Sequence, residues 1–479
     1  MTPRSEPNEP GRVKETGRLD ASAIDSYIDE PVAAADRDRP ISSEAELVAH
    51  FHTGSRTPDR FVIGAEHEKI GVYTTPGEIG RAIPYEGERG IRRILDRLAA
   101  RGYTAIAEGD AIIALDKGGD AVSLEPGGQL ENSGPARRTA AEVARLLDAH
   151  YADVEAASGD LGIAWLGIGY RPFGARADVP WMPKGRYGVM RTYLPTRGQR
   201  GLDMMLRTAT VQANLDYCDE ADAAQKLRTA FGVSSIMTAL WAASPLEDGR
   251  PCGHQSLRAA CWLDTDPDRC GLLPFVFEER DAVFEAYAQW ALDVPMFFLY
   301  RDGYRPAGGV TFRRFLRDGI GGERATISDW VLHLSTLFPE VRLKTFLEIR
   351  GADASTRPMV RALPAFLRGL LYAPDATRAA WSMVRGLSLA EREALRREVP
   401  RLGLSAEVGG RRVRDLAREV VAIARAGLLS LPDGAADAPL LAPLEEVAKT
   451  GRSVADEVLD AHAASDGDVA AFIERVRLR

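Results

Sequence analysis

At 479 residues and a formal net charge of −8, the chain is long enough for a large core, and its acidity argues against nucleic-acid binding, which needs a basic face. No apolar run approaches the roughly 20 residues that span a bilayer, and the charged start of the chain lacks the apolar segment of a signal peptide. These features predict a cytoplasmic protein without a membrane or nucleic-acid partner, and they leave its oligomeric state open between monomer and homodimer.

The first part of the chain differs from the rest in composition. Residues 1–39 are rich in Pro, Glu, Asp, Arg and Ala and show no sustained apolar period. We predict that they are mostly disordered, with one short helix near Ala21–Ile28. Regular structure is expected after this segment, beginning with a helix that Ser42 or Ser43 can cap and that continues through Phe51.

Short runs typical of strands then alternate with amphipathic helices. The expected strands are Phe61–Tyr73, Ala111–Leu115, Ala121–Glu125, Gln129–Asn132, Ile163–Tyr170, Thr208–Tyr217 and Arg342–Arg350. The helices expected among them are Gly90–Arg101, Thr139–Ser158, Glu220–Ala243 and Arg280–Leu292. Beyond residue 360 the pattern is almost wholly helical, with helices expected at Pro364–Leu371, Leu389–Glu398, Val413–Leu429, Pro443–Lys449 and Val454–Ala463. This order predicts an α+β fold, in which an antiparallel sheet carries helices on one face and a helical C-terminal part follows.

Four of the expected strands carry polar side chains along one face, because residues two apart in a strand share a face. One of these strands is preceded by the turn Pro126–Gly128. The polar residues are Glu66 and Glu68 on the first strand; Glu125, which ends the strand before the turn, with Gln129 and Glu131 on the strand after it; Gln212, Asn214 and Asp216 on the next; and Glu348 and Arg350 on the last.

This polar face has two interpretations. A half-solvated antiparallel sheet normally has a polar outer face, which accounts for any one of these strands. An exposed face, however, favours Thr, Lys and mixed charges, whereas these strands offer mainly Glu, Gln and Asn. Clustered carboxylates repel one another unless a cation compensates them, and oxygen ligands on rigid strands suit a hard ion such as Mg²⁺. We therefore predict a site with several Mg²⁺ ions that performs phosphoryl transfer.

Three other motifs carry weaker signals. The run MPKGRYGVMRTY places Lys184, Arg186 and Arg191 in a glycine-containing loop. Such a loop either binds phosphate or carboxylate groups or is simply solvated, and the chain has no GxxxxGK[ST] motif here. GIGYRP (167–172) has too few glycines for a dinucleotide fingerprint, and His67 lacks the second histidine of HExxH, which argues against zinc.

The cysteine pattern gives no sign of a metal site or a disulfide framework. Four cysteines lie in the middle third of the chain, Cys218, Cys252, Cys261 and Cys270, and none belongs to a CxxC pair. We expect reduced, partly buried thiols.

Taken together, these residues give a sequence that resembles the plant-type glutamate–cysteine ligases of plants and many bacteria, over roughly residues 40–470. The similarity rests on long motifs in the same order, including GAEHEK (64–69), SLEPGGQLE (123–131), GLDMMLRTATVQANLDY (201–217) and FPEVRLKTFLEIRGAD (338–353). The resemblance implies a glutamine-synthetase-like fold whose curved antiparallel sheet forms a funnel-shaped site, with helices on its outer face. It also implies a reaction in which ATP and Mg²⁺ are used to make γ-glutamyl phosphate, which the amine of cysteine attacks, in the first step of glutathione-type thiol synthesis.

The resemblance further assigns roles to single residues. It implies that the magnesium ligands are Glu66, Glu68, Glu125, Glu131 and Glu348, the first two also counting as catalytic. It implies that the nucleotide or the metals are touched by Gln129, Gln212 and Asn214. Arg186 and Arg258 are expected to hold glutamate. Strand geometry, more than the resemblance, places Arg350 near phosphoryl oxygens as a catalytic residue. Residues 40–479 are then expected to form a single catalytic domain.

The chain also departs from the family pattern at three places. No cysteine flanks TFRRFL (311–316), so the redox switch of plant members is expected to be absent. Phe297 stands where many relatives have Tyr after DVPM, and Ala354–Arg357 replace the GGPW that often follows RGAD. The last two changes lie where the acceptor amino acid is expected to bind, with Phe297 as a substrate-binding residue.

Three alternatives remain open at this stage. The nearest is the same chemistry with another amine acceptor, and the second is a regulatory relative that has lost catalysis. A carboxylate-pair hydrolase is the third, and it would need neither ATP nor Mg²⁺.

Overall fold

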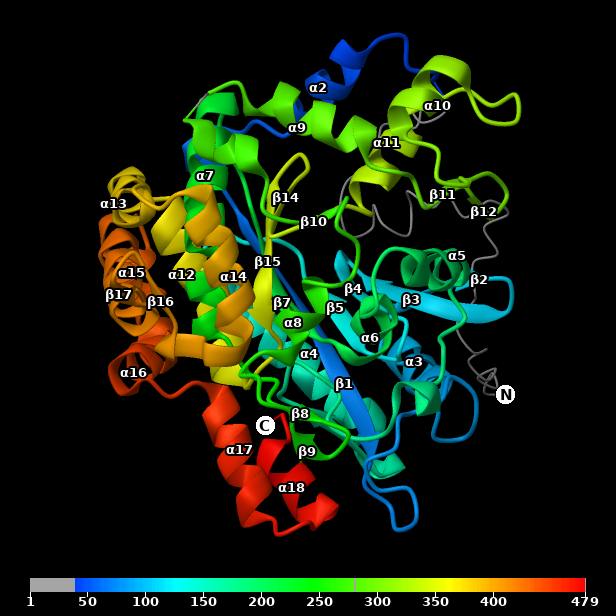
Figure 1. Ribbon diagram of the computed structural model, residues 1–479. Coiled ribbons are helices and arrows are strands. Elements are labelled where there is room, and N and C mark those ends of the chain that lie inside the picture. The colour runs from blue at the N-terminus through cyan, green and yellow to red at the C-terminus, as the bar shows by residue number, and fades with distance from the viewer. Residues whose placement is uncertain (1–38, 280, 479) are drawn as a thin grey trace, which may run out of the picture.

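An antiparallel sheet of nine strands forms the centre of the computed structural model, which describes residues 39–279 and 281–478 (Figure 1). The strand order is β14-β15-β7-β1-β5-β4-β3-β2, and β6 pairs with the far end of β1. The strands are β1 (Ile63–Tyr73), β2 (Thr104–Glu108), β3 (Ala111–Lys117), β4 (Asp120–Leu124), β5 (Leu130–Ser133), β6 (Ile163–Leu166), β7 (Thr210–Leu215), β14 (Val341–Leu343) and β15 (Leu347–Asp353).

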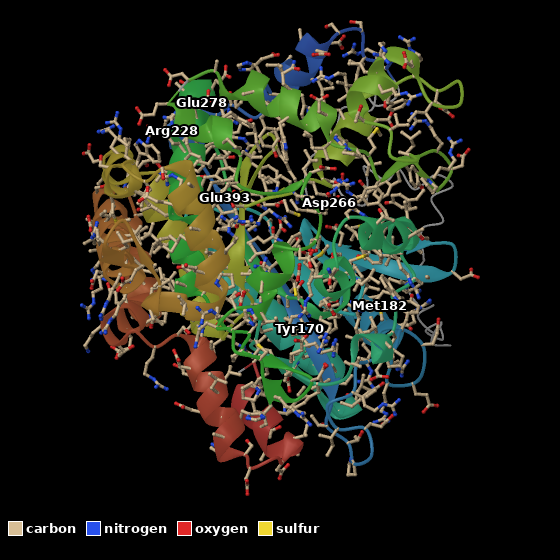
Figure 2. All side chains as sticks on the ribbon, in the orientation of Figure 1. Tyr170, Met182, Arg228, Asp266, Glu278 and Glu393 are labelled. Atoms are coloured by element: carbon tan, nitrogen blue, oxygen red, sulfur yellow. The ribbon has the colours of Figure 1, made fainter. Side chains whose placement is uncertain are left out.

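Helices cover one face of this sheet. α4 (Ala140–Ser158) and α12 (Arg357–Leu371) pack against β1, α12 also contacts β7, and α7 (Glu220–Leu240) packs against β15. Buried apolar side chains of these strands and helices form one continuous core. Figure 2 shows side chains filling the interior, with Tyr170 and Met182 toward the sheet and Glu393 on the side of the C-terminal helices.

The remaining elements surround this frame. The other helices are α2 (Glu44–His52), α3 (Ile91–Ala99), α5 (Gly185–Tyr193), α6 (Gly201–Arg207), α8 (Leu257–Trp262), α9 (Val283–Asp293), α10 (Phe312–Asp318), α11 (Ile327–Leu334), α13 (Pro374–Val384), α14 (Leu389–Leu402), α15 (Val413–Ser430), α16 (Ala442–Thr450), α17 (Val454–Ala464) and α18 (Val469–Val476). Two-residue and three-residue strands form four small pairs: β8 (Leu246–Glu247) with β9 (Arg250–Pro251), β10 (Cys270–Gly271) with β13 (Phe338–Pro339), β11 (Phe298–Tyr300) with β12 (Tyr304–Pro306), and β16 (Glu407–Val408) with β17 (Arg411–Arg412).

The predicted α+β class is confirmed: an antiparallel sheet carries helices on one face, and the C-terminal part is helical. In Figure 1 the helices α12 to α16 gather together on the left of the sheet. Among the described residues, no helix combines the length and the apolar character that crossing a bilayer requires. The four cysteines are free thiols.

Strand alternation separates a polar face from an apolar one, as the sequence pattern indicates. Across the sheet, Glu66 faces Gln212, and Glu68 faces Glu131. The opposite face carries His67, whose Nδ1 lies 3.0 Å from the hydroxyl of Tyr151 in α4. The helices therefore cover the apolar face, and the polar face is left for a site.

Two predicted elements are wrong. Arg342–Arg350 is not one strand but the hairpin β14–β15, in which the N–H of Lys344 donates to the carbonyl of Phe346 at 2.8 Å. The segment after Lys184, expected to be a loop, is the helix α5, although it contains two glycines. Burial of Arg186, Tyr187 and Met190 stabilises this helix and outweighs its weak intrinsic propensity.

The helix predicted from Pro364 is longer than expected, because α12 begins at Arg357 and contains Pro364 in its interior. Proline removes one backbone donor and usually ends a helix. Here most of the helix is buried, Pro364 included, so tertiary packing compensates for the lost hydrogen bond. The predictions for residues 1–39 fall outside the described residues, apart from Arg39.

A buried carboxylate ties the C-terminal helices to the helix behind the sheet. Asp437 is fully buried and accepts the backbone N–H groups of Ala140 (3.1 Å) and Ala141 (2.8 Å) in the first turn of α4. Nη1 of Arg368 in α12 donates to the same carboxylate at 2.6 Å. The negative charge thus satisfies orphan donors at a helix N-terminus and neutralises a buried guanidinium.

We predict that Asp437→Asn lowers the free energy of unfolding by about 3–5 kcal/mol, because Arg368 would be left buried without its counter-charge. Urea unfolding followed by circular dichroism measures this change. The matched control is Asp375→Asn, since Asp375 pairs with Arg378 at a site where the Asp375 side chain is 96% exposed. Equal effects of the two substitutions would contradict the prediction.

Candidate functional site

The polar face of the sheet opens into a cavity of about 150 Å³. All five predicted carboxylates line it: Glu66, Glu68, Glu125, Glu131 and Glu348. Its cationic side chains are Lys184, Arg186, Arg342 and Arg350. The cavity therefore holds both signs of charge on rigid strands and on the neighbouring helix α5.

Burial, together with crowding among the glutamates, makes ionisation of two of them unfavourable. Burial, followed by the charges of Glu125 and Glu131, raises the pKa of Glu68 well above its usual range. Burial, followed by the charge of Glu125, raises the pKa of Glu131 to about 7, although the hydroxyl of Ser123 donates to it at 2.8 Å. Raised carboxylate pKa values in a cavity are typical of a functional site.

These carboxylates fit a hard divalent cation in chemistry but do not form a closed cage. Among the described residues, no three His, Cys, Asp or Glu side chains converge closely enough to hold an ion. Mg²⁺ usually takes only one or two protein carboxylates and completes its shell with water and phosphate oxygens. The oxygen donors Glu68 and Glu131, which lie opposite each other on β1 and β5, match that requirement.

Glu348 is in a different electrostatic state. Its Oε1 lies 2.6 Å from Nη2 of Arg342 and 3.1 Å from Nζ of Lys344, and its Oε2 pairs with Arg350. Burial alone would raise the pKa of Glu348, but these three cations outweigh it and hold the pKa well below its usual range. Glu348 is therefore the anchor of the cationic half of the cavity.

Arg350 lies at the wall between this cavity and a second one. Its Nη1 donates to Oε1 of Gln212 at 2.8 Å, and its guanidinium lies 5.9 Å from the ring of Trp262 and 5.6 Å from that of Phe338. Arg350, Trp262 and Phe338 line both cavities. Arg350 therefore lies in the site, as its position on the expected strand predicted.

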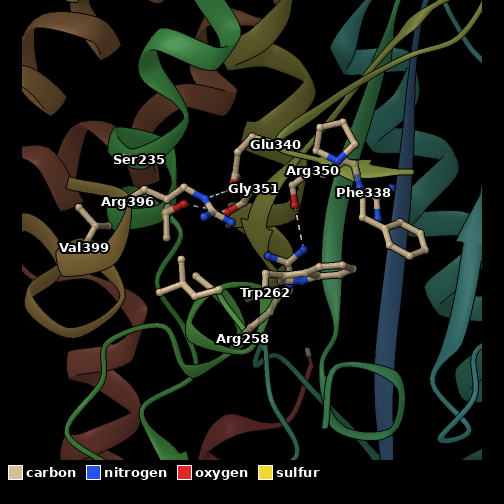
Figure 3. Close-up of a pocket in the computed structure, with 13 residues that line it drawn as sticks. Ser235, Arg258, Trp262, Phe338, Glu340, Arg350, Gly351, Arg396 and Val399 are labelled. Carbon is tan, nitrogen blue, oxygen red and sulfur yellow. Dashed lines mark hydrogen bonds and ion pairs between the residues drawn. The ribbon is translucent and has the colours of Figure 1, made fainter. Parts of the chain in front are cut away.

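The second cavity is much smaller, about 30 Å³, and is rich in arginine (Figure 3). Arg258 donates to the carbonyl of Arg350 at 2.8 Å, and Nε of Arg396 lies 2.7 Å from Oε1 of Glu340. Figure 3 shows both contacts as dashed lines, with Arg258 beneath Trp262. The two arginines expected to hold glutamate are thus not in one cavity, because Arg186 lines the first and Arg258 the second.

Two further predicted residues, both amides, have other contacts. Gln129 lines the first cavity, but its Oε1 accepts the N–H of Gly127 at 2.9 Å and its Nε2 donates to the carbonyl of Thr208 at 2.7 Å. Asn214 does not line either cavity, and its Nδ2 donates to Oε1 of Glu66 at 2.7 Å. Both side-chain amides therefore bond to neighbouring protein groups and stabilise the geometry of the cavity wall.

Phe297 is not brought to either cavity. Its ring is buried, and the guanidinium of Arg269 lies 3.8 Å from its centre. Tyr193 packs against the same ring at 4.9 Å. The position was assigned from the family motif alone, and the structure gives this side chain a packing role.

Sequence reasoning missed part of the cavity wall. The side chains that it did not single out include Met190, Met204, Met205, Tyr187 and Arg342. Arg342 faces Glu348 directly across β14 and β15, so the hairpin was the signal that could have found it. The methionines lie on α5 and α6, two helices that the sequence pattern did not reveal.

Comparisons with known proteins agree on the family. The profile described as glutamate–cysteine ligase family 2 matches residues 62–475. The chain is 42% identical to the chloroplastic glutamate–cysteine ligase of Arabidopsis thaliana, over 88% of this chain and 80% of the relative. It is 40% identical to that of Nicotiana tabacum, over 94% of this chain and 85% of the relative.

A solved structure shares the fold. The glutamate–cysteine ligase of Francisella tularensis, in complex with AMP, superposes with a TM-score of 0.54 at 11% identity and covers 87% of each chain. At this identity the likeness concerns the fold.

The predicted cytoplasmic location is wrong by the same comparisons, since the plant relatives are named chloroplastic. The prediction rested on the absence of an apolar segment. Chloroplast transit peptides are rich in Arg and Ser and need no such segment, so its absence does not separate the two locations. On the extent of the profile match and of the identity to the plant enzymes, the chain belongs to glutamate–cysteine ligase family 2.

Proposed function

We infer that the chain is a glutamate–cysteine ligase, an enzyme that joins the side-chain carboxylate of glutamate to the amine of cysteine. The observation that carries this conclusion is the first cavity, where buried glutamates with raised pKa values face an arginine cluster anchored by Glu348. Its relatives at about 40% identity bear the same enzyme name. An amide bond between two amino acids needs an activated carboxyl group, and a phosphate donor can supply one by forming an acyl phosphate.

We propose that ATP is this donor, in keeping with the AMP held by the Francisella tularensis enzyme. The γ-phosphoryl group of ATP passes to a side-chain carboxylate oxygen of glutamate, which gives ADP and an acyl phosphate. The amine of cysteine, after losing a proton, attacks the acyl carbon. The bond between that carbon and the phosphate oxygen then breaks, and phosphate leaves with the electron pair.

In this proposal, the two halves of the cavity have different functions: one binds metal and the other contacts phosphoryl oxygens. Glu66, Glu68, Glu125 and Glu131 would hold more than one Mg²⁺, with no more than two of these carboxylates on each ion. When bound, Mg²⁺ would neutralise the phosphate charge during transfer. Arg350, fixed by its bonds to Gln212 and to Glu348, would meet the phosphoryl oxygens from the other side.

Glutamate is proposed to lie at the boundary of the two cavities. Arg258 is buried and fixed by its bond to the carbonyl of Arg350, which suits a guanidinium that pairs with the α-carboxylate. Arg186, in the first cavity, would pair with an anionic group there. Because Arg350 lines both cavities, the side-chain carboxylate of glutamate can then be directed toward the phosphate donor.

We also propose that residues 40–479 work as one catalytic unit. The bond network of Asp437 joins the C-terminal helices to α4 behind the sheet, so the helical part supports the site instead of forming a separate module. The oligomeric state, monomer or homodimer, stays a prediction.

The decisive assay is phosphate release from ATP with Mg²⁺, glutamate and each amino acid in turn. We expect release to require all three components and to be fastest with cysteine. Aspartate in place of glutamate is the matched control, because it is one methylene shorter. No release with any amine would overturn the ligase assignment, whereas release with another amine alone would overturn cysteine as the acceptor.

Two glutamine substitutions in the same cavity are predicted to change stability in opposite directions. Glu68→Gln removes a charge from the crowded half, so the metal-free protein should become more stable. Glu348→Gln leaves Arg342, Lys344 and Arg350 without their anion and should lower the free energy of unfolding by about 3–5 kcal/mol. Both should reduce turnover at least about a hundredfold, on the scale of losing one preorganised electrostatic contact. Urea unfolding in the absence of Mg²⁺ measures the change in stability, and phosphate release measures turnover. Changes of the same sign in the free energy of unfolding of the two variants would contradict the division into two halves.

Without divalent cations, the protein is predicted to lose stability as the pH rises through neutrality. The pKa of Glu131 is raised from 4.5 to about 7, so the folded state keeps a proton that the unfolded chain has released. Its contribution is fully present below pH 4.5 and is lost as the pH rises through about 7. Urea midpoints in EDTA across this range measure the slope. Glu131→Gln should flatten the profile, and an equal slope in that variant would exclude Glu131 as the source.

A further inference from the structure

Among the described residues, a buried arginine behind the site has no counter-ion. Arg171, in the GIGYRP segment that the proposed function leaves unexplained, is 1% exposed. Its Nη1 donates to the carbonyl of Gly71 at 3.1 Å and its Nη2 to that of Gly127 at 3.3 Å. In the described part of the chain its Nε has no hydrogen-bond partner, and no carboxylate forms an ion pair with it. Burying such a charge is costly, so its presence calls for a structural reason.

The guanidinium stays charged at neutral pH despite this cost. Burial, with a smaller effect from Arg207, lowers the pKa of Arg171 only to about 10. A charged donor makes stronger hydrogen bonds to carbonyl oxygens than a neutral one. The two carbonyls are therefore held by a cation with a fixed planar shape.

These carbonyls belong to the two segments that carry the crowded glutamates. Gly71 lies in β1, three residues after Glu68. Gly127 is the centre of the turn that joins Glu125 to Gln129. In this turn the N–H of Gly127 donates to Oε1 of Gln129 at 2.9 Å, and the N–H of Gly128 donates to the carbonyl of Glu125 at 2.9 Å. Arg171 thus donates to the carbonyl of Gly127 in the turn and to that of Gly71 in β1, and so links the turn to the strand.

The backbone around both carbonyls is tightly packed. A Cβ at Gly127 would lie 2.2 Å from the carbonyl oxygen of Leu206, and one at Gly71 would lie 2.6 Å from Cδ1 of Ile83. Both segments are tightly packed, and the forked guanidinium of Arg171 reaches both carbonyls. Figure 2 shows Tyr170, the residue before Arg171, on the sheet side of the molecule.

We propose that Arg171 is a positioning residue for the cation site, which fixes Glu125 of the turn relative to Glu66 and Glu68 of β1. The proposal rests on the proposed function, because it takes these glutamates as ligands of a divalent cation. Arg171 itself lines neither of the two cavities of the site. Its effect passes through the carbonyl of Gly127 to the carboxylate two residues earlier.

The test compares Arg171→Met and Arg171→Lys with a matched control, Arg392→Met. Arg392 is also buried, donates to the carbonyls of Leu387 (3.2 Å) and Val384 (2.6 Å), and has a pKa that burial lowers to about 10, but it lies in α14. Hydrogen exchange without metal measures the protection of residues 124–130. Electron paramagnetic resonance measures the binding of Mn²⁺, used as a probe for Mg²⁺.

For Arg171→Met we expect the Kd for Mn²⁺ to rise about 10–100-fold, as when a group that orients a metal ligand is lost, and amide protection in 124–130 to fall. Arg171→Lys, which keeps one bond, should lie between this variant and the wild type. Arg392→Met should leave both readings unchanged even where it lowers Tm. A merely structural role for Arg171 predicts instead that its variants behave as Arg392→Met does.

The outcomes separate this inference from the proposed function. Wild-type protein that binds no Mn²⁺ would overturn the cation site, and exchange in 124–130 would still decide whether Arg171 holds the turn. Wild-type affinity and protection in Arg171→Met would overturn the positioning role. If Arg171→Met does not fold, Arg171→Lys carries the same comparison, and wild-type values in that variant overturn the role as well.

Discussion

Two glutamates placed directly opposite each other, Glu68 on β1 and Glu131 on β5, are the constraint on which the rest of the site depends. Like charges at facing positions of an antiparallel pair destabilise the sheet. The sheet holds them together because its other face is packed against α4 and α12, so strand register is fixed by burial. The resulting excess of negative charge makes this half of the cavity a place for cations.

The opposite half of the cavity contains clustered positive charges, and a protein carboxylate lies among them. Three cations surround Glu348, so the positive charges of Arg342, Lys344 and Arg350 stay close together without excessive repulsion. One half thus gathers carboxylates, and the other keeps a surplus of positive charge around a single carboxylate. A substrate that brings phosphate and metal together matches both halves at once, which links the electrostatics of the cavity to phosphoryl transfer.

The polar face could be predicted from the sequence because strand alternation is a local property. Glu66 and Glu68 must share a face whatever they pair with. Pairing itself is not local: the turn at Lys344–Phe346 converts one expected strand into a hairpin, and this places Arg342 opposite Glu348. The role of Gln129 was hidden for the same reason, since its amide bonds to Thr208, a residue 79 positions away. The placement of Arg186 and Arg258 likewise depends on tertiary structure, because α5 and α8 set it.

Asp437 has a consequence for the order in which the chain is made. The first turn of α4 is capped by a carboxylate that lies 297 residues later in the sequence. At about 5–20 residues per second, a ribosome needs roughly 15–60 seconds to make that intervening chain. During this interval the strands of the site can emerge while the helix behind them lacks its charged cap and the packing of α12. The N-terminal half of the chain therefore emerges before it can reach its final stability, and its exposed sheet face is the surface that a chaperone would meet during synthesis.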